Sequence, residues 1–201
     1  MKILFLSSEA TGLIKTGGLA DVARALPLAL RQKGHDVRLV LPNYLSIVRT
    51  KTYFTAVSSL RVPMGDSELF CAVQQTELEQ LPVYLIEYND FFLRSHPYED
   101  VAGNPHPDNG ERFGFFCKAA LQLCLAENFI PDIIHANDWQ GALACLYLYQ
   151  YRSTYPEFAK TRSLLTIHNG GYQGHCPGSA RRFLEIGNAW FHPEGFEDHG
   201  Q

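Results

Sequence analysis

The chain has 201 residues, of which 46% are hydrophobic and 19% are charged, and its formal net charge is −4. This composition is typical of a globular protein with a hydrophobic core, and the negative charge argues against a basic face for nucleic acid. No apolar run is long enough to cross a membrane, and the first residues lack the features of a signal or transit peptide.

The five cysteines are scattered along the chain and form no Cys-x-x-Cys pair. We therefore predict neither a disulfide framework nor a zinc site. His135 and His168 have no carboxylate or thiolate at ligand spacing, so no metal and no other cofactor is predicted. The expected compartment is the cytoplasm, or a plastid if the source is a plant.

Residues 1–41 predict a β-α-β unit. An apolar run at residues 3–6 is typical of a buried parallel strand, and apolar residues then recur at helical spacing over residues 18–33. Pro27 lies inside this helix and is expected to bend or weaken it, whereas Gly34 is expected to end it. Residues 37–41 form the next strand, with a right-handed crossover between parallel strands.

The remaining elements alternate as well. Two strands that can form a hairpin are predicted at 53–62 and 68–74, and a further strand at 83–86. A long irregular loop follows at 89–110. The last part predicts a helix at 111–128, a strand at 131–135, a helix at 139–151 and a strand at 163–167. Such alternation predicts a doubly wound, mainly parallel, Rossmann-like α/β sheet. Ligands bind beyond the carboxyl ends of the strands in such sheets, which points to the loops 7–18, 136–141 and 168–173.

The first of these loops predicts an anion site. Gly17 and Gly18 let a ligand approach the backbone, and the helix that follows presents free N–H groups and the positive end of its dipole. Lys15 adds a full positive charge. The alternative is a plain glycine-rich connection with a solvated lysine, and the pattern matches neither Gly-x-Gly-x-x-Gly nor a P-loop.

Two polar groups follow later strands. Asp138 is either the N-cap of the next helix or a carboxylate that accepts hydrogen bonds from sugar hydroxyl groups. His168 and Asn169 end the last strand before a glycine pair, where His168 is either structural or a hydrogen-bond donor to a polar ligand.

These stretches resemble one family. Residues 15–22 (Lys-Thr-Gly-Gly-Leu-Ala-Asp-Val), 135–139 (His-Ala-Asn-Asp-Trp), 166–174 (Thr-Ile-His-Asn-Gly-Gly-Tyr-Gln-Gly) and 191–197 (Phe-His-Pro-Glu-Gly-Phe-Glu) are similar to motifs of bacterial glycogen synthases and plant starch synthases, in the same order. Asn137 and Gln140 stand where the family often has histidine, and the glycine pair after Asn169 stands where bulkier residues are common.

The resemblance implies a retaining glycosyltransferase that moves glucose from ADP-glucose, or UDP-glucose, to the non-reducing end of an α-1,4-glucan acceptor. It implies a GT-B fold of two Rossmann-like domains, with residues 1–201 as the N-terminal, acceptor-side domain. Lys15, Gly17 and Gly18 would face the phosphates of the donor. Asp138 would lie beside the acceptor and His168 and Asn169 beside the transferred glucose; by the same resemblance Tyr98 would lie near the acceptor, and Asp21 belongs to the motif.

The family continues into a C-terminal domain that carries most nucleotide contacts, and 201 residues do not contain it. We expect a piece of a longer protein that does not transfer glucose alone. The competing interpretation is a stand-alone module that binds glucan or nucleotide sugar without catalysis. A nucleotide-dependent oxidoreductase is disfavoured, because residues 41–43 (Leu-Pro-Asn) offer no acidic residue for a ribose.

Overall fold

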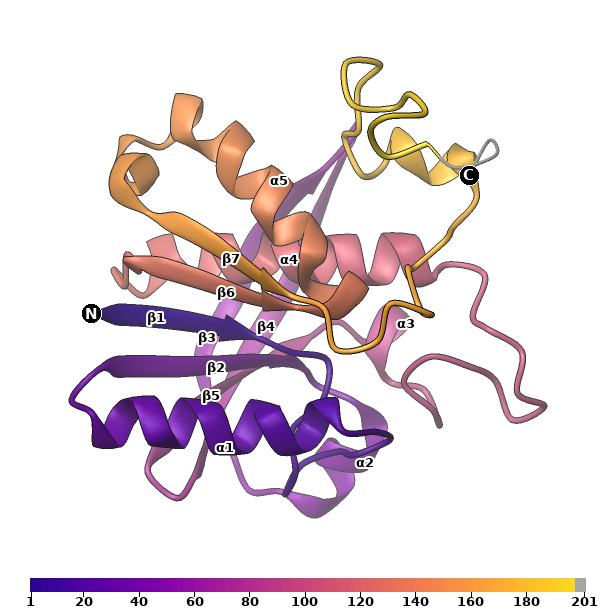
Figure 1. Cartoon of the computed structure of the whole chain (residues 1–201). Coiled ribbons are helices and arrows are strands. Elements are labelled where there is room, and N and C mark those ends of the chain that lie inside the picture. Colours follow the sequence, from indigo (N-terminus) through magenta and orange to yellow (C-terminus); the bar gives the residue numbers. More distant parts are fainter. Residues whose placement is uncertain (198–201) are drawn as a thin grey trace.

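The computed structural model describes residues 1–197, which form one sheet flanked by helices (Figure 1). The strands are β1 Lys2–Leu6, β2 Asp36–Pro42, β3 Phe54–Met64, β4 Ser67–Leu78, β5 Leu81–Glu87, β6 Ile133–Asn137 and β7 Arg162–Thr166. The helices are α1 Leu19–Gln32, α2 Leu45–Thr50, α3 Asn89–Phe92, α4 Asn109–Ala126 and α5 Asp138–Thr154, with 3₁₀ helices at Pro156–Lys160 and Gly178–Arg181.

The sheet order is β3-β4-β5-β2-β1-β6-β7. The five strands from β5 to β7 are parallel, and β4 is antiparallel to both β3 and β5. The prediction of a mainly parallel, doubly wound α/β sheet is confirmed. The chain leaves β1 first toward β2 and later returns across the sheet to β6, so the topology switches direction between β1 and β6, where ligands bind in such folds.

Helices cover both faces of the sheet. The crossovers β1–α1–β2 and β5–α4–β6 run in opposite directions, and right-handed connections therefore place α1 and α4 on opposite faces. Figure 1 shows α1 in front of the strands and α4 behind them. The helix α5 packs against α4, which is largely buried between α5 and the sheet.

The first β-α-β unit forms as its sequence predicts. The residues of the apolar run 3–6 are buried, and α1 continues through the buried Pro27 to Gln32. Gly34 adopts φ +84, and the N–H of His35 donates to the Leu30 carbonyl at 3.2 Å while the Gly34 N–H donates to Arg31 at 2.8 Å. This pair of bonds is a Schellman motif, so the predicted role of Gly34 in ending the helix is confirmed.

The predicted loop 89–110 is shorter in the structure, because Asn89–Phe92 form α3 and α4 already begins at Asn109. The residues between these helices are irregular, as predicted, but they are well anchored. Arg112 of α4 is fully buried and donates to the carbonyl oxygens of Phe91 at 2.7 Å and Pro97 at 2.8 Å. Arg94 forms an ion pair with Asp108 across the loop. These bonds fix the loop beside the end of the sheet that carries the candidate site.

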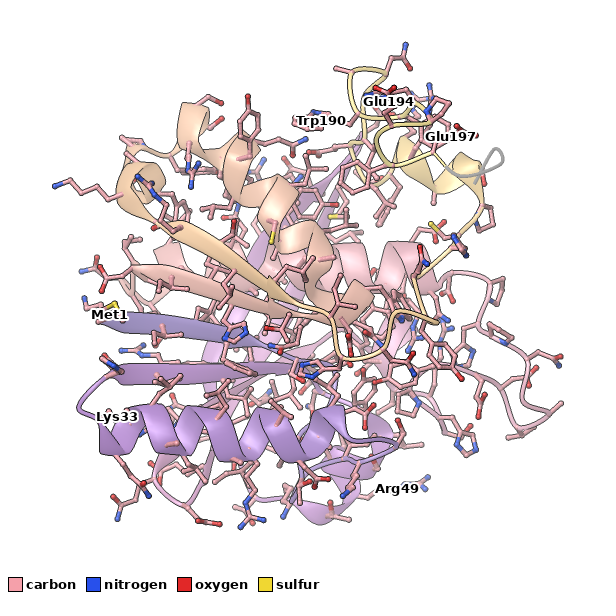
Figure 2. The ribbon with its side chains drawn as sticks, viewed as in Figure 1. Met1, Lys33, Arg49, Trp190, Glu194 and Glu197 are labelled. Carbon is pink, nitrogen blue, oxygen red and sulfur yellow. The ribbon has the colours of Figure 1, made fainter. Side chains whose placement is uncertain are left out.

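The residues after β7 form a segment that packs on α4 and α5. Glu185 is its main anchor, because Oε2 lies 2.5 Å from the Nζ of the nearly buried Lys118, and Oε1 accepts the Gly65 N–H at 3.0 Å. Figure 2 shows Trp190, Glu194 and Glu197 on this segment, far from Met1 at the start of β1.

The strand β7 is an edge of the sheet, and its first four residues are exposed, including Leu164 at 49% and Leu165 at 40%. An exposed apolar edge strand has unpaired backbone groups that favour pairing with another strand.

Candidate functional site

The loops that follow β1, β6 and β7 meet at one edge of the sheet. Leu6 is in register with Ala136, and Asn137 is in register with Thr166. Figure 1 shows the three loops leaving their strands at this edge, with the start of α1 and the long loop before α4 nearby. The prediction that these three loops converge is confirmed.

Neither the backbone conformation nor the packing of the turn before α1 requires glycine at positions 17 and 18. Gly18 is the N-cap of α1 and has φ −70 and ψ −22, a conformation open to any residue. A Cβ atom added at Gly17 or Gly18 would meet nothing within 4 Å. Among the described residues, the N–H groups of Gly18, Leu19 and Ala20 have no acceptor, so they remain donors for an anion.

Part of the predicted anion site already holds a carboxylate of this chain. The buried Glu9 accepts hydrogen bonds through Oε2 from the N–H groups of Thr16 at 2.5 Å and Gly17 at 3.1 Å. Its Oε1 accepts from the Thr16 hydroxyl at 2.6 Å. Sequence reasoning missed Glu9; its only signal was an acidic residue in the loop that follows the buried strand β1.

Lys15 is also paired within the chain. Its Nζ lies 2.7 Å from both carboxylate oxygens of Asp21, and the Thr11 hydroxyl donates to the same carboxylate at 2.7 Å. Hydrogen bonds from Lys15 and Thr11 lower the pKa of Asp21. About half of each side chain in the Lys15–Asp21 pair is exposed, at 51% and 57%, so solvent screens the pair.

Asp138 and His168 contact each other. Asp138 is the first residue of α5 and adopts φ +51, which a short polar side chain tolerates better than most. Its Oδ1 accepts the backbone N–H of His168 at 2.6 Å. The capping interpretation of Asp138 is wrong, because the N-cap of α5 is Asn137 and no side chain caps this helix.

The ring of His168 is oriented by the fully buried Asn137. The Asn137 Nδ2 donates to the Leu6 carbonyl at 2.9 Å, so Oδ1 faces His168 Nε2 at 3.0 Å. An amide oxygen accepts, and Nε2 must therefore carry the proton, which leaves Nδ1 as an acceptor when the ring is neutral. The buried His135 instead contacts the Thr166 hydroxyl at 2.8 Å, and burial lowers its pKa.

Asn169 directly follows His168, and Tyr98 belongs to the long loop between α3 and α4. Asn169 Oδ1 accepts the Gly171 N–H at 2.9 Å, so its side chain stabilises its own turn. The hydroxyl of Tyr98 lies 2.7 Å from Glu9 Oε1 and 2.7 Å from Ser8 Oγ, and its ring lies 6.5 Å from that of Trp139. Within residues 1–197, no hydrogen bond joins Lys15 to Asp138 or His168.

A cavity of about 500 Å³ lies beside Asp138. Its lining is largely apolar and comes from the start of α5, from β7 and from the segment that follows, with Trp139, Ile167, Tyr172 and Phe191 among the wall residues. Residues 1–197 contain no group of three His, Cys, Asp or Glu side chains placed to hold a metal ion. None of their helices is long and apolar enough to cross a membrane.

Comparisons with known proteins agree on one family. The family model for the starch synthase catalytic domain matches residues 2–201. The glycogen synthase of Aeromonas salmonicida is 46% identical over 175 residues, which cover 87% of this chain and 36% of that protein. The glycogen synthase of Geotalea daltonii is 40% identical over 202 residues, which cover 100% of this chain and 42% of that protein.

A solved structure has the same fold. The catalytic domain of starch synthase IV from Arabidopsis thaliana, bound to ADP and acarbose, superposes with a TM-score of 0.82 at 27% identity, over 99% of this chain and 40% of that chain. The mainly parallel α/β sheet therefore matches one half of a GT-B glycosyltransferase. The chain spans about two fifths of the length of these relatives, and it belongs to the starch synthase catalytic domain family.

Proposed function

We propose that residues 1–201 are the acceptor-side domain of a retaining glycosyltransferase that transfers glucose from ADP-glucose to the non-reducing end of an α-1,4-glucan. The observation that carries this proposal is the arrangement at one sheet edge of a helix start with open N–H donors and the Asp138–His168 pair. The names of the relatives and the ADP and acarbose bound to the Arabidopsis enzyme support the same substrates.

The start of α1 and Lys15 are proposed to face the donor phosphates. When the glycosidic bond to the donor breaks, negative charge grows on the leaving diphosphate, and fixed N–H donors stabilise that charge without rearranging. Gly17 and Gly18 keep the approach free of side chains. Asp21 is proposed to hold Lys15 in place until phosphate competes for its ammonium group.

Asp138, His168, Tyr98 and Asn169 are proposed to face sugars. Asp138 accepts hydrogen bonds from acceptor hydroxyls, and the His168 Nδ1 accepts one from the transferred glucose. Tyr98 flanks the acceptor, and Asn169 shapes the turn around the glucose.

In this proposal a second, nucleotide-binding domain completes the cleft, so the chain alone makes no glucan. Because that domain would read the base, UDP-glucose stays an alternative donor. All five cysteines are free thiols, which supports a cytoplasmic location.

The test is calorimetric titration of the chain with maltoheptaose and, separately, with ADP-glucose. We expect Asp138→Asn to weaken maltoheptaose binding about tenfold, the effect of losing one hydrogen bond to a charged group. Asparagine preserves the acceptor for the His168 N–H and tolerates φ > 0, so stability should hold. Asp90→Asn, at an exposed position, is the matched control. Gly18→Ala should weaken ADP-glucose alone, because its Cβ enters open space in the fold.

Unchanged maltoheptaose affinity in Asp138→Asn would refute the acceptor role. Glucan synthesis from ADP-glucose by this chain alone would refute the claim that half of the cleft is missing. The second candidate is a binding module without catalysis, which the exchangeable Lys15–Asp21 pair and the open donors of α1 also fit. Joining the chain to a nucleotide-binding domain of a relative separates the two, since only the first candidate predicts glucan synthesis in the fusion.

A further inference from the structure

Glu9 is a buried carboxylate that no cation neutralises. It is 4% exposed, and among the described residues it takes part in no ion pair, because the nearby Lys15 is engaged by Asp21. Transferring a carboxylate out of water costs several kcal/mol unless donors replace the lost solvent. Its surroundings must therefore supply those donors.

Four donors surround the Glu9 carboxylate. Oε2 accepts from the backbone N–H groups of Thr16 and Gly17, and Oε1 accepts from the hydroxyl groups of Thr16 and Tyr98. Burial and the neighbouring Tyr44 and Glu9 raise the pKa of Tyr98 well above its usual value, so the phenol keeps its proton and donates. A carboxylate accepts only, so every one of these bonds points toward Glu9.

The four donors come from two loops that are far apart in sequence. Thr16 and Gly17 belong to the glycine turn before α1, and Tyr98 belongs to the long loop before α4. Two further contacts hold Tyr98 in place: its backbone carbonyl accepts a hydrogen bond from Asn109 Nδ2 at 2.9 Å, and its hydroxyl contacts Ser8 Oγ. Glu9 is thus the side chain through which the two loops share hydrogen bonds.

We infer that Glu9 is a positioning residue that joins the donor-side glycine turn to the acceptor-side Tyr98, and that it permanently fills the anion site at the N–H groups of Thr16 and Gly17. This inference rests on the proposed function. The donor phosphates then bind the open N–H groups of Gly18, Leu19 and Ala20 instead. Replacing Glu9 should therefore weaken the binding of both substrates, although the Glu9 carboxylate contacts neither of them.

The experiment uses the 201-residue chain and three variants. Glu9→Ala removes the carboxylate and leaves its four donors around a cavity, while Glu9→Gln fills the space with an amide whose NH₂ group opposes those donors. Glu77→Ala is the matched control, because Glu77 is exposed and its side chain forms no hydrogen bond or ion pair with the other described residues. Maltoheptaose and ADP-glucose affinities are measured for each variant in sodium chloride and in sodium acetate at equal ionic strength.

We expect Glu9→Ala to weaken both ligands about tenfold in chloride. Acetate should restore most of this loss in a saturable way, since its carboxylate re-forms the four bonds. Glu9→Gln should weaken both ligands and gain nothing from acetate, because its side chain occupies the site. Tyr98→Phe, which removes one donor from one loop, should weaken maltoheptaose more than ADP-glucose. A general loss of packing would not respond to acetate, so rescue separates positioning from mere stabilisation.

Several outcomes overturn the inference. If wild type binds both ligands and Glu9→Ala binds them equally well, or responds to acetate no more than the control, Glu9 has no positioning role while the proposed function stands. If wild type binds neither ligand, the proposed function fails and the inference fails with it. Should Glu9→Ala not fold, wild-type affinities in Glu9→Gln would overturn the inference by themselves.

Discussion

Asn137 is proposed to touch no substrate, but its removal should lower both the stability of the chain and its affinity for maltoheptaose. It is fully buried at the end of β6, and its amide joins three strand ends. Nδ2 donates to the Leu6 carbonyl at 2.9 Å and to the His135 carbonyl at 3.3 Å, and Oδ1 accepts from His168 Nε2 at 3.0 Å. Each such bond contributes about 1 kcal/mol, so Asn137→Ala should lower the free energy of unfolding by about 3 kcal/mol.

Urea denaturation measures this change, with Asn89→Ala as the control. Asn89 is exposed and its side chain has no hydrogen-bond partner within residues 1–197, so its variant should stay within about 0.5 kcal/mol of wild type. A ¹⁵N NMR spectrum of the histidine rings supplies the second readout. Wild-type His168 should carry its proton on Nε2 when neutral, whereas Asn137→Ala should populate both tautomers and bind maltoheptaose more weakly.

A loss below about 1 kcal/mol would show that the three bonds are not net stabilising. A His168 ring that keeps the Nε2 tautomer in Asn137→Ala would refute the orienting role of the amide, whatever the effect on stability.

Three further predictions concern stability and association. In Gly174→Ala the new Cβ would lie 2.6 Å from the Trp139 ring at φ +73, so the variant should lose about 2–3 kcal/mol in urea unfolding, against about 1 kcal/mol for Gly34→Ala, whose Cβ meets nothing. Burial lowers the pKa of His135 in the folded chain, so as the pH falls this histidine binds a proton at a higher pH in the unfolded chain than in the folded one. Stability should therefore fall as pH drops below about 6.5, less steeply in His135→Gln, and equal slopes would contradict this. Leu164→Lys should reduce self-association in sedimentation velocity by charging the exposed edge strand, and unchanged association would exclude β7 as the contact.

The buried strands and the first helix could be predicted from the sequence, because the patterns that indicate them lie within a few neighbouring residues. Continuous apolar runs identify the buried parallel strands, and Gly34 ends α1 in the expected way. Boundaries are less accurate: β6 extends to Asn137, and α5 begins at Asp138 instead of Trp139. Asp138 enters the helix with φ +51, a conformation that helical periodicity does not reveal.

The polar network of the site could not be predicted, because its partners are distant in sequence. Tyr98 meets Glu9 across 89 positions, and Asn137 meets Leu6 across 131. Neither pairing leaves a periodic or spaced pattern. Residues 15–22 predict an anion site at the start of α1, but only the folded chain shows that Glu9 accepts two of the N–H groups of that turn.

The two carboxylates at the glycine turn differ in how easily a ligand displaces them. Asp21 and Lys15 are about half exposed, so water screens their attraction and can replace either partner when a phosphate arrives. Glu9 is buried, and releasing it would leave the N–H groups of Thr16 and Gly17 and the Thr16 hydroxyl without an acceptor. In the proposed function, exchange at this site is therefore confined to Lys15, which leaves Asp21 for a donor phosphate while Glu9 holds the turn in its conformation. In the proposed function, the chain thereby places a mobile positive charge beside fixed N–H donors, and the fixed donors stabilise charge on the leaving diphosphate without rearranging.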